Sequence, residues 1–263
     1  ILREDDIIDL IEREGKSIAL IMLGGVNYLT GQLFDMPRIT ASGHAAGCTV
    51  GWDLAHAAGN VPLQLHDWNA DFAAWCSYKF LNAGPGAVAG CFVHERHSKN
   101  TKWGGEGALP RFAGWWGNDP ATRFRMGPEF TPVASADAWQ LSNPPILAMA
   151  PLRVSLEIFD RAGMPALRAK ALQLTAYMQW LLTGSSPTQP ESRFRIITPP
   201  DPERRGCALS IAVQGGGKDT VTKLRARGVV CDFREPNVVR AAPVPLYNSF
   251  HDVWRFTNIL REI

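Results

Sequence analysis

The sequence has no apolar stretch long enough to cross a membrane. Its longest apolar runs, such as Ile18 to Leu23, are far shorter than the roughly 20 residues that a transmembrane helix needs. The first residues also lack the basic and apolar regions of a secretory signal peptide. These absences predict a protein without a membrane partner, and the cytoplasm is its expected location.

The chain also lacks a strong charge of either sign. It carries 27 basic and 25 acidic side chains, and no segment is dense in lysine and arginine. Proteins that bind nucleic acid ordinarily carry a basic patch, so nucleic acid is not an expected partner. The 5 cysteines are odd in number and show no Cys-x-x-Cys spacing, which favours neither a disulfide framework nor a zinc site. We therefore expect reduced thiols and no metal.

The first part of the chain alternates short apolar segments with helical patterns. Such alternation is typical of an α/β layer with a mostly parallel sheet, in which ligands bind at the carboxyl ends of the strands. The segment 17–23 is apolar almost throughout, so we expect this strand to be buried on both faces. Strands are predicted at residues 17–23, 48–52, 71–77 and 87–93, and helices at residues 5–15 and 39–47.

The second part begins with residues 98–140, which are rich in Gly, Trp, Pro and Arg and show little periodicity. Loops of this length in a compact domain tend to be functional. We predict two domains, residues 1–162 and a smaller α+β unit of residues 163–263. The elements expected after the loops are helices near 145–162, 164–182, 218–227 and from 249, and strands near 194–197, 207–213 and 229–232.

Three polar residues between Gly51 and Gly90 suit a bound pyridoxal phosphate (PLP). Asp53 closes one apolar run, His56 follows it, and Lys79 comes after a second apolar run, beside apolar residues and glycines. A lysine can form a Schiff base with an aldehyde cofactor only where its amine can lose a proton, as in a partly desolvated site. Asp53 could keep the pyridine nitrogen of PLP protonated, and His56 could bond to the ring hydroxyl.

Each of these residues also has an ordinary structural interpretation. Asp53 could cap a helix, a helical histidine such as His56 is more often structural, and a single lysine is usually solvated. The Tyr78 hydroxyl and the backbone N–H groups of residues 82–86 could contact the cofactor phosphate. The histidines without regular ligand spacing are expected to be structural: His66, His94 and His97.

Taken together, the motifs resemble those of kynureninase, a PLP enzyme of the aspartate-aminotransferase-like large-domain class. The resemblance implies a PLP-dependent transferase-like large domain, α/β and incomplete at its N-terminal end, plus a small C-terminal α+β domain. It also implies hydrolysis of L-kynurenine or 3-hydroxy-L-kynurenine to anthranilate or 3-hydroxyanthranilate and L-alanine, in tryptophan catabolism and NAD biosynthesis. The matching segments, in order, are VGWDLAHAAGN, LHDW, DFAAWCSYKFLNAGPG, GWWG, LSNPPI, RGVVCD and APVPLYNSFHD.

The resemblance assigns the cofactor contacts near Gly51 to Gly90 residue by residue. Lys79 matches the Schiff-base lysine, Asp53 the partner of the pyridine nitrogen, and His56 its neighbour at the ring. Tyr78 matches the tyrosine that contacts the phosphate and helps to relay protons.

Further matches lie downstream. Trp115 and Asn143 match positions that reach the cofactor site from the second subunit of a homodimer with shared active sites. Ser142 and Asn143 fall where relatives discriminate the aromatic ring of the substrate. Arg240 matches the arginine that grips the substrate α-carboxylate, a task that suits a planar bidentate donor.

Two departures from the family pattern leave alternatives open. The family's complete chain is longer, which implies that a phosphate-binding loop and a ring-stacking aromatic residue are missing here. Gly24 stands where some relatives have a phosphate-contacting serine. One alternative is a cysteine desulfurase or another class V aminotransferase-like enzyme, which would need a reactive loop cysteine, whereas Cys207 and Cys231 lie at the ends of strand-like runs. The other is a truncated, non-catalytic subunit.

Overall fold

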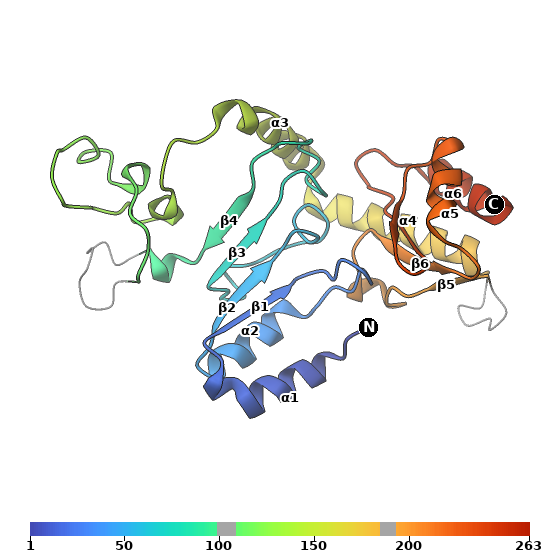
Figure 1. Ribbon diagram of the computed structural model, residues 1–263, viewed down its shortest axis with the longest axis horizontal. Coiled ribbons are helices and arrows are strands. Elements are labelled where there is room, and N and C mark those ends of the chain that lie inside the picture. The colour runs from blue at the N-terminus through green and yellow to red at the C-terminus, as the bar shows by residue number, and fades with distance from the viewer. Residues whose placement is uncertain (99–108, 185–192) are drawn as a thin grey trace.

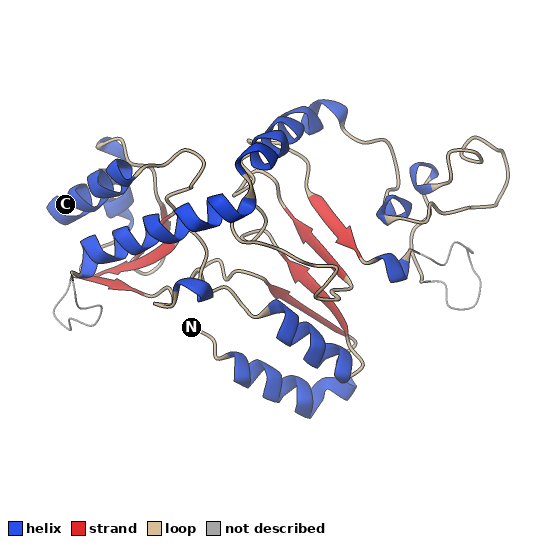
Figure 2. Ribbon diagram, turned by 180° about the vertical axis from the view of Figure 1, so that it is seen from behind, coloured by secondary structure: helices blue, strands red, loops and turns tan. Residues whose placement is uncertain are grey.

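The computed structural model describes residues 1–98, 109–184 and 193–263. These residues form two units that lie side by side, each built on its own 4-stranded sheet (Figure 1). Helices α3 (Ile146–Ala162) and α4 (Met164–Thr183) run in succession along the back of the molecule and connect the two units (Figure 2).

The larger unit contains a mostly parallel sheet in the order β1-β2-β3-β4. The first three strands are parallel and β4 is antiparallel, which confirms the predicted α/β class. Helices α1 and α2 cover one face, where Ile8, Ile11 and Ile39 pack with Val50 and Trp52. The bounds are α1 (Glu4–Glu14), β1 (Leu20–Gly24), α2 (Met36–Ala45), β2 (Thr49–Asp53), β3 (Phe72–Trp75) and β4 (Gly90–Val93).

One expectation for β1 is wrong. Leu20 and Met22 are 48% and 50% exposed, so the strand is not buried on both faces. Successive side chains of a strand point to opposite faces of the sheet. Ile21 therefore points into the core with α1 and α2, whereas Leu20 and Met22 lie on the opposite face, which the described residues leave open. The strand also begins later than predicted, because residues 15–17 form a turn of 3₁₀ helix.

The smaller unit contains an antiparallel sheet in the order β5-β6-β8-β7. One face packs against helices through Leu174, Met178, Leu209 and Leu260. The short strand β8 had no counterpart in the sequence analysis, and β7 begins three residues later than predicted. The bounds are β5 (Phe194–Ile196), β6 (Leu209–Val213), α5 (Lys218–Ala226), β7 (Asp232–Arg234), β8 (Val238–Ala241) and α6 (Phe250–Glu262).

The predicted boundary after residue 162 falls at Gly163, between α3 and α4. The first hydrophobic cluster extends to Leu167 and the second begins at Leu174, which supports a division in this region. The exact boundary stays a prediction.

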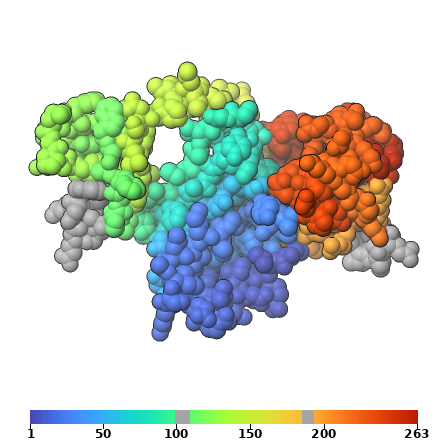
Figure 3. All heavy atoms as spheres, viewed as in Figure 1, coloured from blue at the N-terminus to red at the C-terminus, as the bar shows by residue number. Residues whose placement is uncertain are grey.

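Residues 109–145 form a lobe beyond β4, which stands out from the body of the molecule on the side away from the smaller unit (Figure 3). Its only helical segments are the 3₁₀ turns Trp115–Gly117 and Ala136–Trp139, so the prediction of long loops is confirmed for these residues. Residues 99–108, which belong to the same predicted loop, lie outside the described residues. Among the helices that the structure describes, none is long and apolar enough to span a bilayer.

Candidate active site

Asp53 is the last residue of β2 and lies at the carboxyl end of the sheet, beside Gly24 of β1 and Ala74 of β3. Its Oδ1 accepts the N–H of Ala55 at 2.8 Å, which caps the turn that follows rather than a helix. Its second oxygen makes no hydrogen bond to any described residue, and the side chain is exposed. One carboxylate oxygen is therefore available to a ligand.

His56 lies on the turn after β2, with its ring centroid 5.9 Å from that of Phe80. Burial, together with the nearby charges of Lys79 and Arg240, lowers the pKa of His56 to about 4. The imidazole is therefore neutral near pH 7 and can both donate and accept a hydrogen bond. His56 also lines one cavity together with Phe80, from the segment after β3, and Arg240 of β8.

Lys79 lies in the segment that follows β3. Its Nζ is 5.9 Å from the centroid of the Tyr78 ring, and it forms no ion pair with an acid among the described residues. The loop after it turns sharply, because Asn82, Gly84 and Gly86 have φ angles of 58°, 84° and 81°. A half-buried amine without a carboxylate partner is suited to reaction with an aldehyde.

Arg240 projects from β8 toward the larger unit. Its guanidinium donates to the backbone oxygen of Tyr28, in the loop after β1, and forms an ion pair with Asp232, its cross-strand neighbour on β7. Asp232 also pairs with Arg234 at 2.9 Å. The Nε of Arg240 is buried without a hydrogen-bond partner among the described residues.

Two adjoining cavities lie where these elements meet. One, of about 110 Å³, is lined by His56, Asp232 and Arg240, among others. The other, of about 250 Å³, is lined by Asp53 and also by His56. Both share Val26, Asn27 and Tyr28, so we treat them as one cleft between the two units. A larger cavity, of about 430 Å³, lies within the smaller unit and has none of the predicted site residues in its lining.

The residues that line the cleft, together with Lys79 next to the lining residue Phe80, fit the ring and aldehyde of PLP. A free carboxylate oxygen suits a protonated pyridine nitrogen, a neutral imidazole suits the ring hydroxyl, and an unpaired amine suits the aldehyde. Fewer polar groups are placed to contact the phosphate. Tyr78 offers a hydroxyl, the turn at Gly84 and Gly86 offers backbone N–H groups, and Gly24 offers no side chain.

Five predicted site residues line neither cavity of this cleft: Tyr78 and Lys79, which precede the lining residue Phe80, and Trp115, Ser142 and Asn143. Trp115, Ser142 and Asn143 lie on or beside the lobe beyond β4, and none lines either cavity of the cleft. Trp115 instead contacts Trp116 and Phe124, with ring centroids 5.7 Å apart in each pair. Their role in a partner's site stays a prediction.

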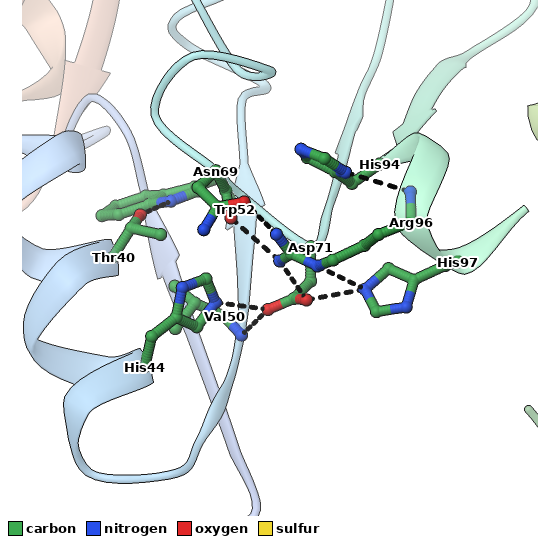
Figure 4. A network of polar contacts seen from close by, with 9 residues as sticks. All are labelled: Thr40, His44, Val50, Trp52, Asn69, Asp71, His94, Arg96 and His97. Carbon is green, nitrogen blue, oxygen red and sulfur yellow. Dashed lines mark hydrogen bonds and ion pairs between the residues drawn. The ribbon is translucent and has the colours of Figure 1, made fainter. Parts of the chain in front are cut away.

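The sequence analysis missed a polar network around Asp71, at the opposite end of β3 (Figure 4). The carboxylate accepts the N–H of Val50 at 2.7 Å and contacts His44 Nε2 at 2.8 Å, His97 Nε2 at 2.6 Å, and Arg96. Burial would raise the pKa of Asp71, but these hydrogen bonds outweigh it and hold that pKa well below its usual range. The sequence feature that could have indicated this network is the position of Asp71, an acid immediately before an apolar strand.

The thiols considered for a desulfurase are unsuited to nucleophilic chemistry. Burial raises the pKa of Cys207 and of Cys231 to about 12. Thiolate is the nucleophilic form, and neither residue would carry it near pH 7. Among the described residues, no group of three or more His, Cys, Asp or Glu side chains could hold a metal ion.

Comparisons of sequence give one consistent family. The family profile "Kynureninase C-terminal domain" matches residues 167–260. The chain is 58% identical to the kynureninase of Koribacter versatilis over 255 residues, which are 97% of this chain and 58% of that protein. It is 56% identical to the kynureninase of Salinispora tropica, covering 98% of this chain and 59% of that protein. The chain thus spans about three-fifths of the length of these relatives.

Solved structures with the same fold are more distant in sequence. The cysteine desulfurase CsdA of Escherichia coli matches with a TM-score of 0.76 and 19% identity, over 97% of this chain and 61% of that one. A C-DES variant with glycine covalently linked to its PLP cofactor also gives 0.76 and 19%, over 98% and 64%. At this identity the likeness shows the fold alone, and it confirms the predicted fold class.

Proposed function

Because this chain belongs to the kynureninase family, we propose that the protein is a PLP-dependent hydrolase of kynurenine. It would cleave the Cβ–Cγ bond of L-kynurenine or 3-hydroxy-L-kynurenine to give anthranilate or 3-hydroxyanthranilate and L-alanine. That reaction belongs to tryptophan catabolism and NAD biosynthesis, and we propose a cytoplasmic location. The observation that carries the proposal is the cleft lined by Asp53, His56 and Arg240, with Lys79 next in the chain to the lining residue Phe80.

When bound, PLP supplies an electron sink for the bonds at the substrate Cα. Lys79 would hold the cofactor covalently and, once the substrate amine has taken its place, move the proton at Cα. Asp53 would keep a proton on the pyridine nitrogen with its free oxygen. His56, which is neutral near pH 7, would bond to the ring hydroxyl, and Tyr78 would contact the phosphate.

Arg240 would bind the α-carboxylate of the substrate. The cross-strand pair with Asp232 and the bond to Tyr28 O hold its guanidinium at the cleft, so little side-chain freedom remains to be lost on binding. A bidentate arginine–carboxylate pair fixes orientation as well as charge. The substrate amine would then lie toward Lys79 and the cofactor.

A homodimer with shared active sites is part of the proposal. Leu147 of α3 is 90% exposed, and contiguous apolar patches are uncommon on monomeric proteins. Trp115 and Asn143 belong to the same region, so self-association there would carry them toward a partner. The exposed apolar residues of α3 and of the lobe include Phe112, Phe124, Met126, Ile146, Leu147 and Val154.

We expect Leu147→Asp to weaken the dimer. A charge at the centre of an apolar interface would lose its hydration on association, so the dissociation constant should rise by about tenfold or more. Sedimentation velocity over a concentration series would measure this shift. Leu10→Asp, on the exposed side of α1, is the control and should leave association unchanged. If both variants had the same dissociation constant as the wild type, α3 would not be part of the interface.

The function itself is tested by turnover in the complete protein that carries this chain. With PLP and L-kynurenine we expect anthranilate and L-alanine in equal amounts, measured by fluorescence and by amino-acid analysis. L-cysteine should release no sulfide, because the buried thiols of Cys207 and Cys231 cannot accept sulfur. Sulfide without anthranilate would instead support the desulfurase alternative. Turnover of neither substrate would support the non-catalytic subunit.

A further inference from the structure

We propose that Asn60 is a positioning residue that sets His56, on the cofactor side of the cleft, relative to Arg240, on the substrate-carboxylate side. This inference rests on the proposed function for the roles of His56 and Arg240. The inference rests on the buried side-chain amide of Asn60, which forms hydrogen bonds to both units.

Asn60 is 4% exposed, and both ends of its side chain are engaged. Its Nδ2 donates to the backbone oxygen of His56 at 2.8 Å. Its Oδ1 accepts the backbone N–H of Cys207 at 2.7 Å. One amide therefore connects the turn after β2 in the larger unit to the residues that lead into β6 in the smaller unit.

The close approach of the two units at this point depends on Gly206. A Cβ placed on Gly206 would lie 2.3 Å from Nδ2 of Asn60, closer than non-bonded atoms approach. Residue 206 thus has no room for a side chain while the amide is in place. The amide, His56, Gly206 and Arg240 all line the same cavity of about 110 Å³.

The smaller-unit end of this bridge is rigid. Arg205, which is 2% exposed, donates to Gln179 Oε1 on α4 at 2.7 Å and to the backbone oxygen of Pro199 at 3.2 Å. Cys207 leads directly into β6, which pairs with β8, so that Ser210 lies opposite Arg240. A shift at Cys207 is therefore passed along β6 to the strand that carries Arg240.

A second set of contacts joins the units on another side of the cavity. Arg240 donates to Tyr28 O, and Ser210 Oγ donates to Leu29 O, both in the loop after β1. These bonds hold β6 and β8 to that loop but make no contact with the His56 turn. Among the described residues, Asn60 makes the side-chain hydrogen bond between that turn and the smaller unit.

The test uses two substitutions that act differently on the two ends of the amide. Asn60→Ala removes both hydrogen bonds. Asn60→Asp keeps an acceptor for the Cys207 N–H but places a carboxylate oxygen against the His56 oxygen. Because a misplacement of about 1 Å can cost about 10²-fold in rate, we expect Asn60→Ala to lower kcat/KM for L-kynurenine by about that factor, with KM raised about tenfold.

For Asn60→Asp we expect a defect that depends on pH. The introduced carboxyl group can donate to the His56 oxygen only when it is protonated. The ratio of its kcat/KM to that of the wild type should therefore rise as the pH is lowered from about 8 to about 6, whereas the ratio for Asn60→Ala should stay flat.

The matched control is Thr40→Val. In the wild type, the buried indole N–H of Trp52 donates to the Thr40 hydroxyl at 3.0 Å, and the substitution removes this acceptor. Neither residue lines the cleft. This variant should lose stability with KM unchanged. If Asn60→Ala behaved in the same way, Asn60 would be a structural residue only and the proposal would be wrong.

A second readout needs no turnover. Amide hydrogen exchange at Cys207, measured by mass spectrometry without cofactor, should speed up about tenfold or more in Asn60→Ala and stay protected in Asn60→Asp. If the exchange rate at Cys207 were unchanged in Asn60→Ala, the claim that Asn60 joins the two units would be wrong. If the complete protein did not hydrolyse kynurenine, the proposed function would fail, while this exchange result would still decide whether Asn60 joins the two units.

Discussion

Lys79→Ala is expected to abolish turnover of L-kynurenine in the complete protein. In the proposed mechanism, the substitution removes both the amine that would hold PLP and the base that would move the proton at the substrate Cα. Loss of one proton-transfer group alone costs about 10²- to 10⁴-fold, and loss of the covalent attachment adds to this. We expect activity to fall by about 10⁴-fold or more, measured as anthranilate release.

The same variant should lose the covalent adduct with PLP. Reduction of the wild-type protein with borohydride, followed by peptide mass spectrometry, should place the modified lysine at position 79. Lys79→Arg separates charge from chemistry, because a guanidinium keeps the positive charge beside His56 but stays protonated and forms no Schiff base. Lys170→Ala is the control, since Lys170 is bonded to the backbone oxygen of Pro245 and should not carry the adduct. An adduct at another lysine would overturn the assignment of Lys79.

The sequence pointed to the part of the candidate site that is local in the chain. Asp53, His56 and Lys79 follow two strands whose carboxyl ends meet at one edge of a parallel sheet, so apolar runs and topology rules suffice to bring them together. Arg240 was identified only through the resemblance. Its strand β8 is a short run beside prolines, and such a run carries little periodicity of its own.

The residues that were missed depend on contacts between distant parts of the chain. Tyr28 matters through its backbone oxygen, and Asn60 through a backbone N–H donor 147 residues away. Neither function leaves a pattern in the neighbouring sequence. The exposure of Leu20 and Met22 was missed for a related reason, because an apolar run shows which residues can be buried but not which faces of the sheet are covered.

Asp71→Ala is expected to cause the largest loss of stability among these variants. Asp71 is 6% exposed, and its carboxylate neutralises Arg96 and accepts bonds from Val50, His44 and His97. Removing one partner from a buried charged network leaves the others without compensation, at a cost of about 3–5 kcal/mol. Equilibrium unfolding in urea at pH 7 would measure the difference. The exposed Asp67, 3.3 Å from His66, is the control, and Asp67→Ala should change the free energy of unfolding by less than about 1 kcal/mol.

The pH dependence of the unfolding free energy should show how much of the acid sensitivity comes from the Asp71 carboxylate. The folded-state pKa of Asp71 lies well below the value of about 3.9 expected in the unfolded chain, so in acid the unfolded state binds more protons. The stabilisation is therefore complete above the unfolded pKa and is lost as the pH falls from about 4 toward the folded pKa. In Asp71→Ala that part of the acid sensitivity should be missing, so its unfolding free energy should fall less steeply below about pH 4. Parallel curves for the two proteins would show that Asp71 is not the source.

Because Asp71 and Lys79 lie toward opposite ends of β3, the KM of the variant should stay unchanged at temperatures where it is folded. Stability and chemistry would then be shown to depend on different ends of the same strand.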